Sequence, residues 1–279
     1  SWFDAVNHAF TTMATGGFSV RNTSIASYQS DAITWVIVVF TFLAGINFSL
    51  LYAVVRGRIK DALRSEELRW YLLILAITIT LICVDLHVEL GQGWYESAKD
   101  AAFQATTIMS TTGYATKDFT LWPTFSRCIL VLLMYVGGCA GSTAGGMKVS
   151  RLMLQVKSLR RELDHIIHPN RVSVITMDGQ SVDEKAVTSA HMFQVAYLLI
   201  LMAGTLVVSL DVLGFTESFV ASLTCISNVG PSLGTLGPMA NFAPLSWFSK
   251  LVLALIMLMG RLELMPLLVL LSPSTWRNK

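Results

Sequence analysis

Residues 106–116 of the chain read TTIMSTTGYAT, a short hydroxyl-rich stretch that contains a glycine–aromatic pair and has a hydrophobic segment on either side. Two other stretches are related to it, because residues 11–19 read TTMATGGFS and residues 224–232 read TCISNVGPS. We call them, in chain order, the first, second and third glycine loops. A motif that recurs along a chain indicates a repeat architecture, so these loops decide how the fold is interpreted.

Further residues come into register when the loops are aligned on their shared glycine. These glycines are 96 and 117 residues apart, at Gly17, Gly113 and Gly230. Six residues before the glycine every copy has a threonine, at Thr11, Thr107 and Thr224. Thirteen residues before it every copy has an acidic residue, at Asp4, Asp100 and Glu217. The agreement indicates one structural unit used three times.

The composition indicates a membrane protein. Of the 279 residues, 53% are hydrophobic and 14% are charged, with a mean hydropathy of +0.59, whereas a soluble domain carries about 25% charged residues. The four cysteines lie in or beside apolar runs without paired spacing, which favours buried small residues over disulfides or metal ligands. The sequence opens inside a repeat, without an initiator methionine or a signal-peptide pattern, so we expect a C-terminal fragment of a longer chain.

Five apolar stretches are candidates for membrane spans, although a full transmembrane helix needs about 20 apolar residues. They are residues 33–55, 68–86, 124–136, 192–213 and 247–271. We expect the first of them to be one continuous helix in which Asn47 makes an interhelical hydrogen bond. Three shorter apolar stretches lead into the glycine loops and are expected to be half-membrane helices. They are residues 1–15, 95–109 and 216–226.

The predicted repeat unit is therefore a span, a short helix, a glycine loop and a second span. The chain contains two complete units and one that lacks its first span, which predicts three domains. They are residues 1–67, 68–185 and 186–279. Residues 148–163 have the spacing of an amphipathic helix, and residues 172–179 indicate a small hairpin.

The distribution of basic residues predicts the orientation in the membrane. Three segments hold 14 of the 20 Lys and Arg residues, namely 56–69, 148–185 and 277–279. The positive-inside rule places these segments in the cytoplasm and all three glycine loops on the outer side.

Non-helical backbone within a membrane is costly unless protein or a water-filled cavity surrounds it. Three half-membrane helices that end in such backbone on one side therefore predict loops that meet around a shared axis. Their carbonyl oxygens could replace the hydration shell of a cation, and the C-terminal ends of the short helices would add partial negative charge. The structural alternative for each loop is an ordinary connection between two helices.

Residues 137–146 read GGCAGSTAGG and form what we call the glycine-rich segment. Each interior glycine weakens a helix by about 1 kcal/mol relative to alanine, so this segment should break the helix near the middle of the membrane. The alternative is close helix packing through small residues. A phosphate-binding loop is disfavoured, because Met147 occupies the lysine position of that motif and no strand precedes it.

Arg261 lies near the middle of the apolar stretch 247–271, where an arginine costs about 2.5–3.5 kcal/mol to insert. An ion pair with Glu263 is the structural alternative, but residues two apart on a helix do not face each other. We expect Arg261 to point into a pore beneath the glycine loops, where its charge would repel a cation.

The glycine loops, the sequence GGCAGSTAGGMK at residues 137–148 and the sequence MLMGRLELMP at residues 257–266 resemble one family over essentially the whole chain. That family is the membrane subunit of Trk-type bacterial potassium uptake systems, TrkH. The resemblance implies an all-α, multi-pass protein of the bacterial inner membrane, with four repeats of helix, pore helix, filter loop and helix around a pseudo-fourfold pore. Three loops cannot close a four-loop filter, so this chain alone should not conduct.

The resemblance also implies roles for individual residues. Filter carbonyls are assigned to Thr15, Gly16, Gly17, Thr111, Thr112, Gly113, Asn228, Val229 and Gly230. The gate is assigned to an intramembrane loop and an arginine, namely Gly137, Gly138, Gly141, Gly145, Gly146 and Arg261. No loop here has the TVGYG sequence of tetrameric potassium channels, so the residues favour cation conduction without fixing a preference for K⁺ over Na⁺.

The transported ion implied by the resemblance is K⁺, or Rb⁺ in its place, held as a metal ion by filter carbonyls, with no covalent cofactor. The implied partners are a second copy in a homodimer, a cytosolic nucleotide-binding regulatory ring like TrkA, and membrane lipid, with no nucleic acid. The basic segments 56–69 and 148–171 are candidate contacts for the ring or for anionic lipid headgroups.

Two other classes of function compete with this interpretation. A secondary transporter coupled to H⁺ or Na⁺, of the symporter type, would also contain a broken helix such as residues 137–146. Against it, the repeats run parallel and Glu263 is the one carboxylate in the middle of a span. An intramembrane enzyme is disfavoured, because the spans lack HExxH, paired aspartates and a Ser/His pair at membrane depth.

Overall fold

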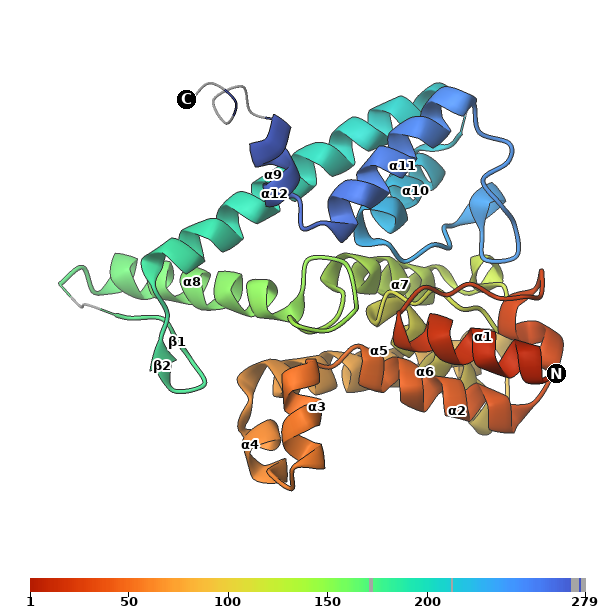
Figure 1. Cartoon of the computed structure of the whole chain (residues 1–279), viewed down its shortest axis with the longest axis horizontal. Coiled ribbons are helices and arrows are strands. Elements are labelled where there is room, and N and C mark those ends of the chain that lie inside the picture. Colours follow the sequence, from red (N-terminus) through yellow and green to blue (C-terminus); the bar gives the residue numbers. More distant parts are fainter. Residues whose placement is uncertain (171–172, 212, 272–275, 277–279) are drawn as a thin grey trace.

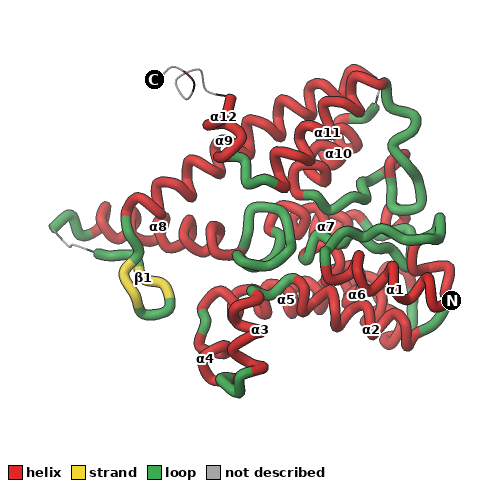
Figure 2. The backbone as a smooth tube through the Cα atoms, viewed as in Figure 1, coloured by secondary structure: helices red, strands yellow, loops and turns green. Residues whose placement is uncertain are grey.

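The computed structural model describes residues 1–170, 173–211, 213–271 and 276, and the regular secondary structure of these residues is almost entirely helical (Figures 1 and 2). The α-helices are α1 (Trp2–Met13), α2 (Asp31–Ala44), α3 (Phe48–Val55), α4 (Ile59–Arg64), α5 (Glu66–Leu90), α6 (Trp94–Met109), α7 (Thr124–Val136), α8 (Val149–Ile167), α9 (Glu184–Val208), α10 (Phe215–Ser227), α11 (Trp247–Arg261) and α12 (Met265–Leu271). Short 3-10 helices lie at Ser24–Tyr28, Phe119–Leu121, Ser209–Asp211 and Gly234–Leu236. The strands β1 (Thr176–Met177) and β2 (Gln180–Ser181) pair antiparallel.

The three half-membrane helices are confirmed, as α1, α6 and α10, and each leads directly into a glycine loop. They have 12, 16 and 13 residues, too few to cross a membrane at 1.5 Å per residue. In the later two units a long helix packs along the short one, α5 against α6 and α9 against α10. The short helices are therefore held by longer neighbours, and their C-terminal ends carry the loops.

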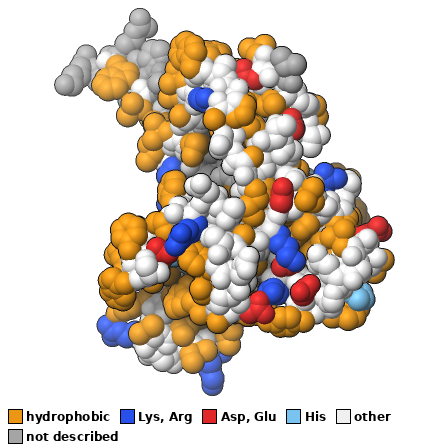
Figure 3. Space-filling model, turned by 90° about the vertical axis from the view of Figure 1, so that its right-hand side faces the viewer, with side chains coloured by type: hydrophobic (Ala, Val, Ile, Leu, Met, Phe, Trp, Pro, Cys, Tyr) orange, Lys and Arg blue, Asp and Glu red, His pale blue; other side chains and the backbone are white. Residues whose placement is uncertain are grey.

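Within the described residues, two helices are long and apolar enough to cross a membrane, namely α5 and the stretch Glu184–Asp211 that begins with α9. Both start earlier in the chain than the apolar runs at 68–86 and 192–213 indicated, because charged first turns extend them. Much of their outer surface is hydrophobic, and apolar side chains cover large parts of the face shown in Figure 3. Such a surface is typical of a protein in contact with lipid.

The prediction of one continuous helix over residues 33–55 is wrong. The chain bends by 106° between α2 and α3, with the break at Gly45, Ile46 and Asn47. Asn47 does not bridge two spans; its side-chain oxygen instead accepts a hydrogen bond from the Ser49 amide (2.8 Å) and caps α3. Gly45 packs so closely on Tyr71 that an added Cβ atom would lie 2.5 Å from the phenol oxygen. Tertiary packing therefore turns an apolar run into two helices.

The predicted span at 247–271 is also interrupted. α11 ends at Arg261 and α12 begins at Met265, so Arg261 lies at a helix end and not in the middle of a helix. Glu263 has φ +60°, a left-handed value through which a helix cannot continue. Its carboxylate forms a salt bridge with Arg151 of α8 and not with Arg261, the alternative considered from the sequence.

The amphipathic helix is confirmed as α8 and runs four residues beyond the predicted end at 163. The hairpin is confirmed as β1 and β2, with Asp178 and Gly179 at the turn, although residue 172 lies outside the described residues. In Figure 1, α8 and the hairpin extend to the left, away from the side where the N-terminus and α1 lie. The basic residues of α8 therefore lie at the opposite end of the molecule from the N-terminus of α1.

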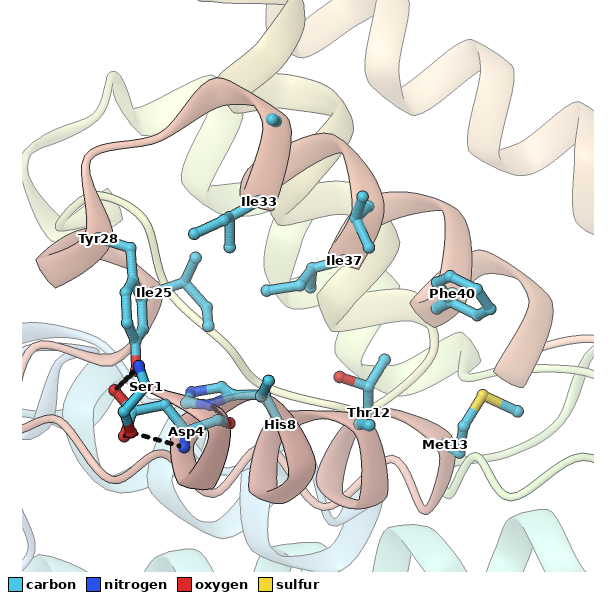
Figure 4. A pocket seen from close by; sticks show the side chains of 14 residues that line it. Ser1, Asp4, His8, Thr12, Met13, Ile25, Tyr28, Ile33, Ile37 and Phe40 are labelled. Atoms are coloured by element: carbon cyan, nitrogen blue, oxygen red, sulfur yellow. Dashed lines mark hydrogen bonds and ion pairs between the residues drawn. The ribbon is translucent and has the colours of Figure 1, made fainter.

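A hydrophobic core joins α5, α6, α7, α9, α10 and α11 into one body. Beside it, α1 and α2 line an open pocket of about 540 Å³ (Figure 4). Ile33, Ile37 and Phe40 of α2 line it on one side, and His8 and Thr12 of α1 line it on the other.

Candidate ion filter and gate

The three glycine loops repeat the same backbone conformation. In each loop the aligned glycine and the residue two positions before it both have positive φ, which is uncommon for residues other than glycine. The φ values are 49° and 65° at Thr15 and Gly17, 56° and 80° at Thr111 and Gly113, and 57° and 107° at Asn228 and Gly230. Three different sequences therefore adopt one geometry, which an ordinary helix connection does not require.

The aligned threonines stabilise this turn through hydrogen bonds. The backbone carbonyl of Thr107 accepts a hydrogen bond from the Thr112 amide (2.8 Å), and Thr11 and Thr224 accept the same bond from the amides five residues later. Their hydroxyls then hold the chain beyond the turn: Thr107 accepts from the Tyr114 amide and Thr224 from the Gly230 amide, both at 2.9 Å. The aligned threonines therefore stabilise the loops through hydrogen bonds to the backbone, a role that the sequence alignment alone did not reveal.

The aligned acidic residues hold the segment that follows each loop. Asp100 forms a salt bridge with Lys117 (2.6 Å). Asp4 pairs in the same way with Arg21 (3.4 Å), and both basic residues lie four positions after their glycine. In the third copy Glu217 accepts a hydrogen bond from the Thr235 amide (2.8 Å). Each short helix therefore anchors both ends of its own loop.

The three loops contact one another in sequence. A Cβ atom added to Gly17 would lie 1.8 Å from the carbonyl oxygen of Thr112, so the first loop touches the backbone of the second. A Cβ atom on Gly113 would lie 1.9 Å from the carbonyl oxygen of Val229, so the second loop touches the third in the same way. At Gly230 an added Cβ atom would have no described atom within 4 Å. The second loop therefore contacts both the first and the third, and the third presents an open face.

The glycine-rich segment packs against all three loops. The Thr15 hydroxyl donates to the carbonyl oxygen of Thr143 (2.9 Å), and the amide of Gly145 donates to the Thr111 hydroxyl (2.7 Å). A Cβ atom at Gly145 would lie 2.2 Å from the carbonyl oxygen of Ser227, so only glycine fits against the third loop. The predicted helix break is confirmed, since α7 ends at Val136 and no helix resumes before Val149.

Arg261 meets the glycine-rich segment directly. One guanidinium nitrogen donates to the carbonyl oxygen of Thr143 (2.9 Å) and the other to that of Ala14 (3.3 Å). Ala14 caps the C-terminal end of α1, where the helix dipole concentrates partial negative charge. The guanidinium therefore bridges the segment and the first short helix.

Not all predicted gate glycines approach the loops. Gly138 and Gly141 pack instead against the bend between α2 and α3, near the carbonyl of Gly45 and the side chain of Asn47. The Cys139 amide donates to the Gly45 carbonyl (2.9 Å). Gly137 and Gly146, both with positive φ, pack on each other where the segment enters and leaves. The half of the segment nearest the loops is therefore residues 143–145.

Two residues of this cluster were missed in the sequence. Thr143 accepts hydrogen bonds from both Thr15 and Arg261 and so joins the first loop to the arginine. Lys148, 8% exposed, extends its ammonium group to the carbonyl oxygen of Ala144 and adds a second cation to the segment. A lysine beside an apolar run is a signal that could have identified it, because buried charge at membrane depth is costly.

Comparison with known proteins gives the family. The family model TrkH, described as "Cation transport protein", matches residues 1–278. The chain belongs to the TrkH family. The Trk system potassium uptake protein TrkH of Escherichia coli is 33% identical over 99% of this chain and 57% of its own length. TrkI of Halomonas elongata is 35% identical over 99% of this chain and 56% of its own length.

The crystal structure of the potassium transporter TrkH from Vibrio parahaemolyticus matches with a TM-score of 0.92 and 33% identity, over 99% of this chain and 60% of that one. The TrkH fold, an all-α membrane protein, thus agrees with the prediction. This TrkH-family chain spans less than two thirds of the length of these relatives. Membership of a cation transport family agrees with a transport protein and not an enzyme. No group of three or more His, Cys, Asp or Glu side chains that could hold a metal ion occurs in the described part of the chain.

Proposed function

We propose that this chain supplies most of a channel-like pathway for K⁺ across the bacterial inner membrane, with a filter of backbone carbonyls. The observation that carries the proposal is the consecutive contact of three loops with one backbone geometry. A ring built from such loops would present several carbonyl oxygens to one axis, the arrangement that replaces the hydration shell of a cation. The filter carbonyls are those of residues 15–17, 111–113 and 228–230.

The choice of K⁺ rests on the relatives, whose names are those of potassium uptake proteins. The open face at Gly230 supports a filter that closes only with a further loop. On this proposal the domains are the end of one pore repeat (1–67), a complete repeat with the glycine-rich segment (68–185) and a second complete repeat (186–279).

The gate in this proposal is the glycine-rich segment together with Arg261. The segment packs beneath the loops through residues 143–145, and the guanidinium donates to the carbonyl of Thr143. A resident cation on the axis would meet fixed positive charge there, which raises the free energy of its passage. Flux then requires the segment and the arginine to move aside.

The proposed partners are a second copy of the protein, membrane lipid and a cytosolic nucleotide-binding ring. The name of the relatives, a Trk system, supports additional components. The basic helix α8, which extends away from the loops in Figure 1, is the proposed contact for such a component.

A secondary transporter coupled to H⁺ or Na⁺ is the competing function, and its broken helices are present at α2–α3 and at the glycine-rich segment. The two are separated by reconstituting the full-length protein in liposomes and measuring uptake of radioactive Rb⁺. Uptake that K⁺ competes with and that needs no Na⁺ or proton gradient supports the channel. Strict dependence on a coupling ion would overturn it.

A further inference from the structure

Glu67 is a buried carboxylate that none of the roles above includes. It lies in the first turn of α5 and is 8% exposed. One of its oxygens, Oε1, accepts hydrogen bonds from two backbone amides, those of Ala140 (2.7 Å) and Ser150 (3.1 Å). Ala140 lies within the glycine-rich segment, and Ser150 lies four residues beyond the end of that segment, in α8.

The two hydrogen bonds come from amides in different structural settings, one in a loop and one in the first turn of a helix. Ser150 lies in the first turn of α8, where helix amides have no partner within the helix. The residue at the N-terminal cap, Lys148, has no acceptor to offer, so Glu67 caps α8 from another helix. Its charge also faces the positive end of the α8 dipole.

The bond from Ala140 lies ten residues earlier, just after α7 has ended. One carboxylate therefore closes the chain between 140 and 150 into a loop and fixes its two ends at one point. Closing a flexible loop restricts its conformations, and hydrogen bonds to a charged acceptor are roughly twice as strong as neutral ones. A glycine-rich segment needs such a restraint, because its residues have few side chains of their own to pack.

The neighbouring residue connects the same turn of α5 to α8 and the hairpin. The Glu66 carboxylate pairs with Lys157 of α8, and the Glu66 amide donates to Asp178 in the hairpin turn (2.6 Å). Glu66 makes no hydrogen bond to the glycine-rich segment in the contacts of the described residues. Glu66 therefore contacts the hairpin and the body of α8, whereas Glu67 contacts the first turn of α8 and the glycine-rich segment.

We propose that Glu67 is a positioning residue that clamps the chain at residues 140 and 150, on either side of residues 143–145, and holds the glycine-rich segment against the filter loops. The proposal deepens the function proposed above, and it rests on that function for its effect on ion flow. Because Ser150 is the second residue of α8, a displacement of α8 breaks one of the two bonds and loosens the segment. Glu67 is thus the point through which movement of α8 reaches the gate.

The test measures the segment itself before it measures transport. The full-length protein, in wild-type form and as Glu67→Ala, is subjected to hydrogen–deuterium exchange in detergent or lipid. We expect the amides of Ala140 and Ser150 to exchange about tenfold faster or more in the variant, because each loses a charge-assisted hydrogen bond. Glu66→Gln is the matched control, one residue away on the same helix. Its amide oxygen can still accept a hydrogen bond from Lys157 of α8, so both amides should exchange as in the wild type.

Glu67→Gln separates clamping from mere packing. The amide oxygen keeps the shape and both acceptor contacts without the charge, so exchange should lie between that of wild type and that of Glu67→Ala. If Glu67→Ala does not fold, the comparison of Glu67→Gln with Glu66→Gln decides. Faster exchange at the two amides in Glu67→Gln alone supports the clamp, and equal exchange in both overturns it.

Rb⁺ flux into liposomes is the second measurement, and Glu67→Ala should raise it while Glu67→Gln restores a value near wild type. A wild-type protein that takes up no Rb⁺ would refute the proposed function. The role of Glu67 would then be tested by the hydrogen–deuterium exchange result alone. A wild-type protein that conducts, together with a folded Glu67→Ala of unchanged flux and unchanged exchange, would refute the clamp alone.

Discussion

The contact between the second and third glycine loops gives the sharpest prediction. Gly113 has φ +80°, and a Cβ atom there would lie 1.9 Å from the carbonyl oxygen of Val229 and 2.8 Å from Pro231. A carbon and a carbonyl oxygen in contact need about 3.3 Å, so Gly113→Ala must separate the two loops by about 1.4 Å. Both contacting groups are fixed, one in the backbone and one in a proline ring.

The chain offers a matched control for this change. Gly179, in the turn between β1 and β2, has φ +79° and an added Cβ atom would meet nothing within 4 Å. Alanine at either position has the same left-handed strain, about 1–2 kcal/mol. Only Gly113→Ala adds the overlap with the next loop, which costs about 1–3 kcal/mol further.

Thermal unfolding of the purified full-length protein and Rb⁺ flux into liposomes measure the two consequences. Gly179→Ala should lower stability slightly and leave flux near wild type, whereas Gly113→Ala should lower stability more and abolish most of the flux. Equal loss of stability in both variants, with normal flux in Gly113→Ala, would show that the loops do not meet as a rigid ring.

Three further changes test the site and the fold. Arg261→Ala removes the guanidinium bonded to Thr143 and should raise Rb⁺ flux, while Arg261→Lys keeps the charge and should raise it less; unchanged flux with normal expression contradicts the gate role. Thr107→Val leaves the Tyr114 amide without its acceptor and should lower the free energy of unfolding by about 1–3 kcal/mol in thermal melts. A loss within experimental error would show that the Thr107 hydroxyl does not stabilise the loop. Asn47→Ala removes the cap of α3 and should cost about 1 kcal/mol in the same melts, whereas a continuous helix through residue 47 predicts a gain instead.

The short helices and glycine loops could be predicted because their signals are local. Each short helix is an apolar run too brief for a span, and each loop has a glycine that its backbone needs, as at Gly113. The break at residues 137–146 followed from glycine density for the same reason. These features depend on the residues themselves and on few distant contacts.

The bends in the spans could not be predicted in this way. Residues 33–55 contain one glycine and read as a helix, yet the close approach of Tyr71 to Gly45 and the bond from Cys139 turn the chain there. Arg261 was singled out correctly as unusual, but its position at a helix end depends on Glu263, whose partner is on α8. Such partners lie on other helices, between 26 and 112 residues away, where sequence spacing carries no information.

By itself, the sequence determined a membrane protein built from three copies of one unit, because hydropathy and the repeated Gly17, Gly113 and Gly230 record local requirements of the backbone. Only the tertiary structure decided that the copies meet edge to edge, and that Thr143, Arg261 and Glu67 gather around one segment beneath them. The physical reason is that a backbone carbonyl or amide looks the same at every position of a sequence. Which of them meet is fixed only when the helices pack.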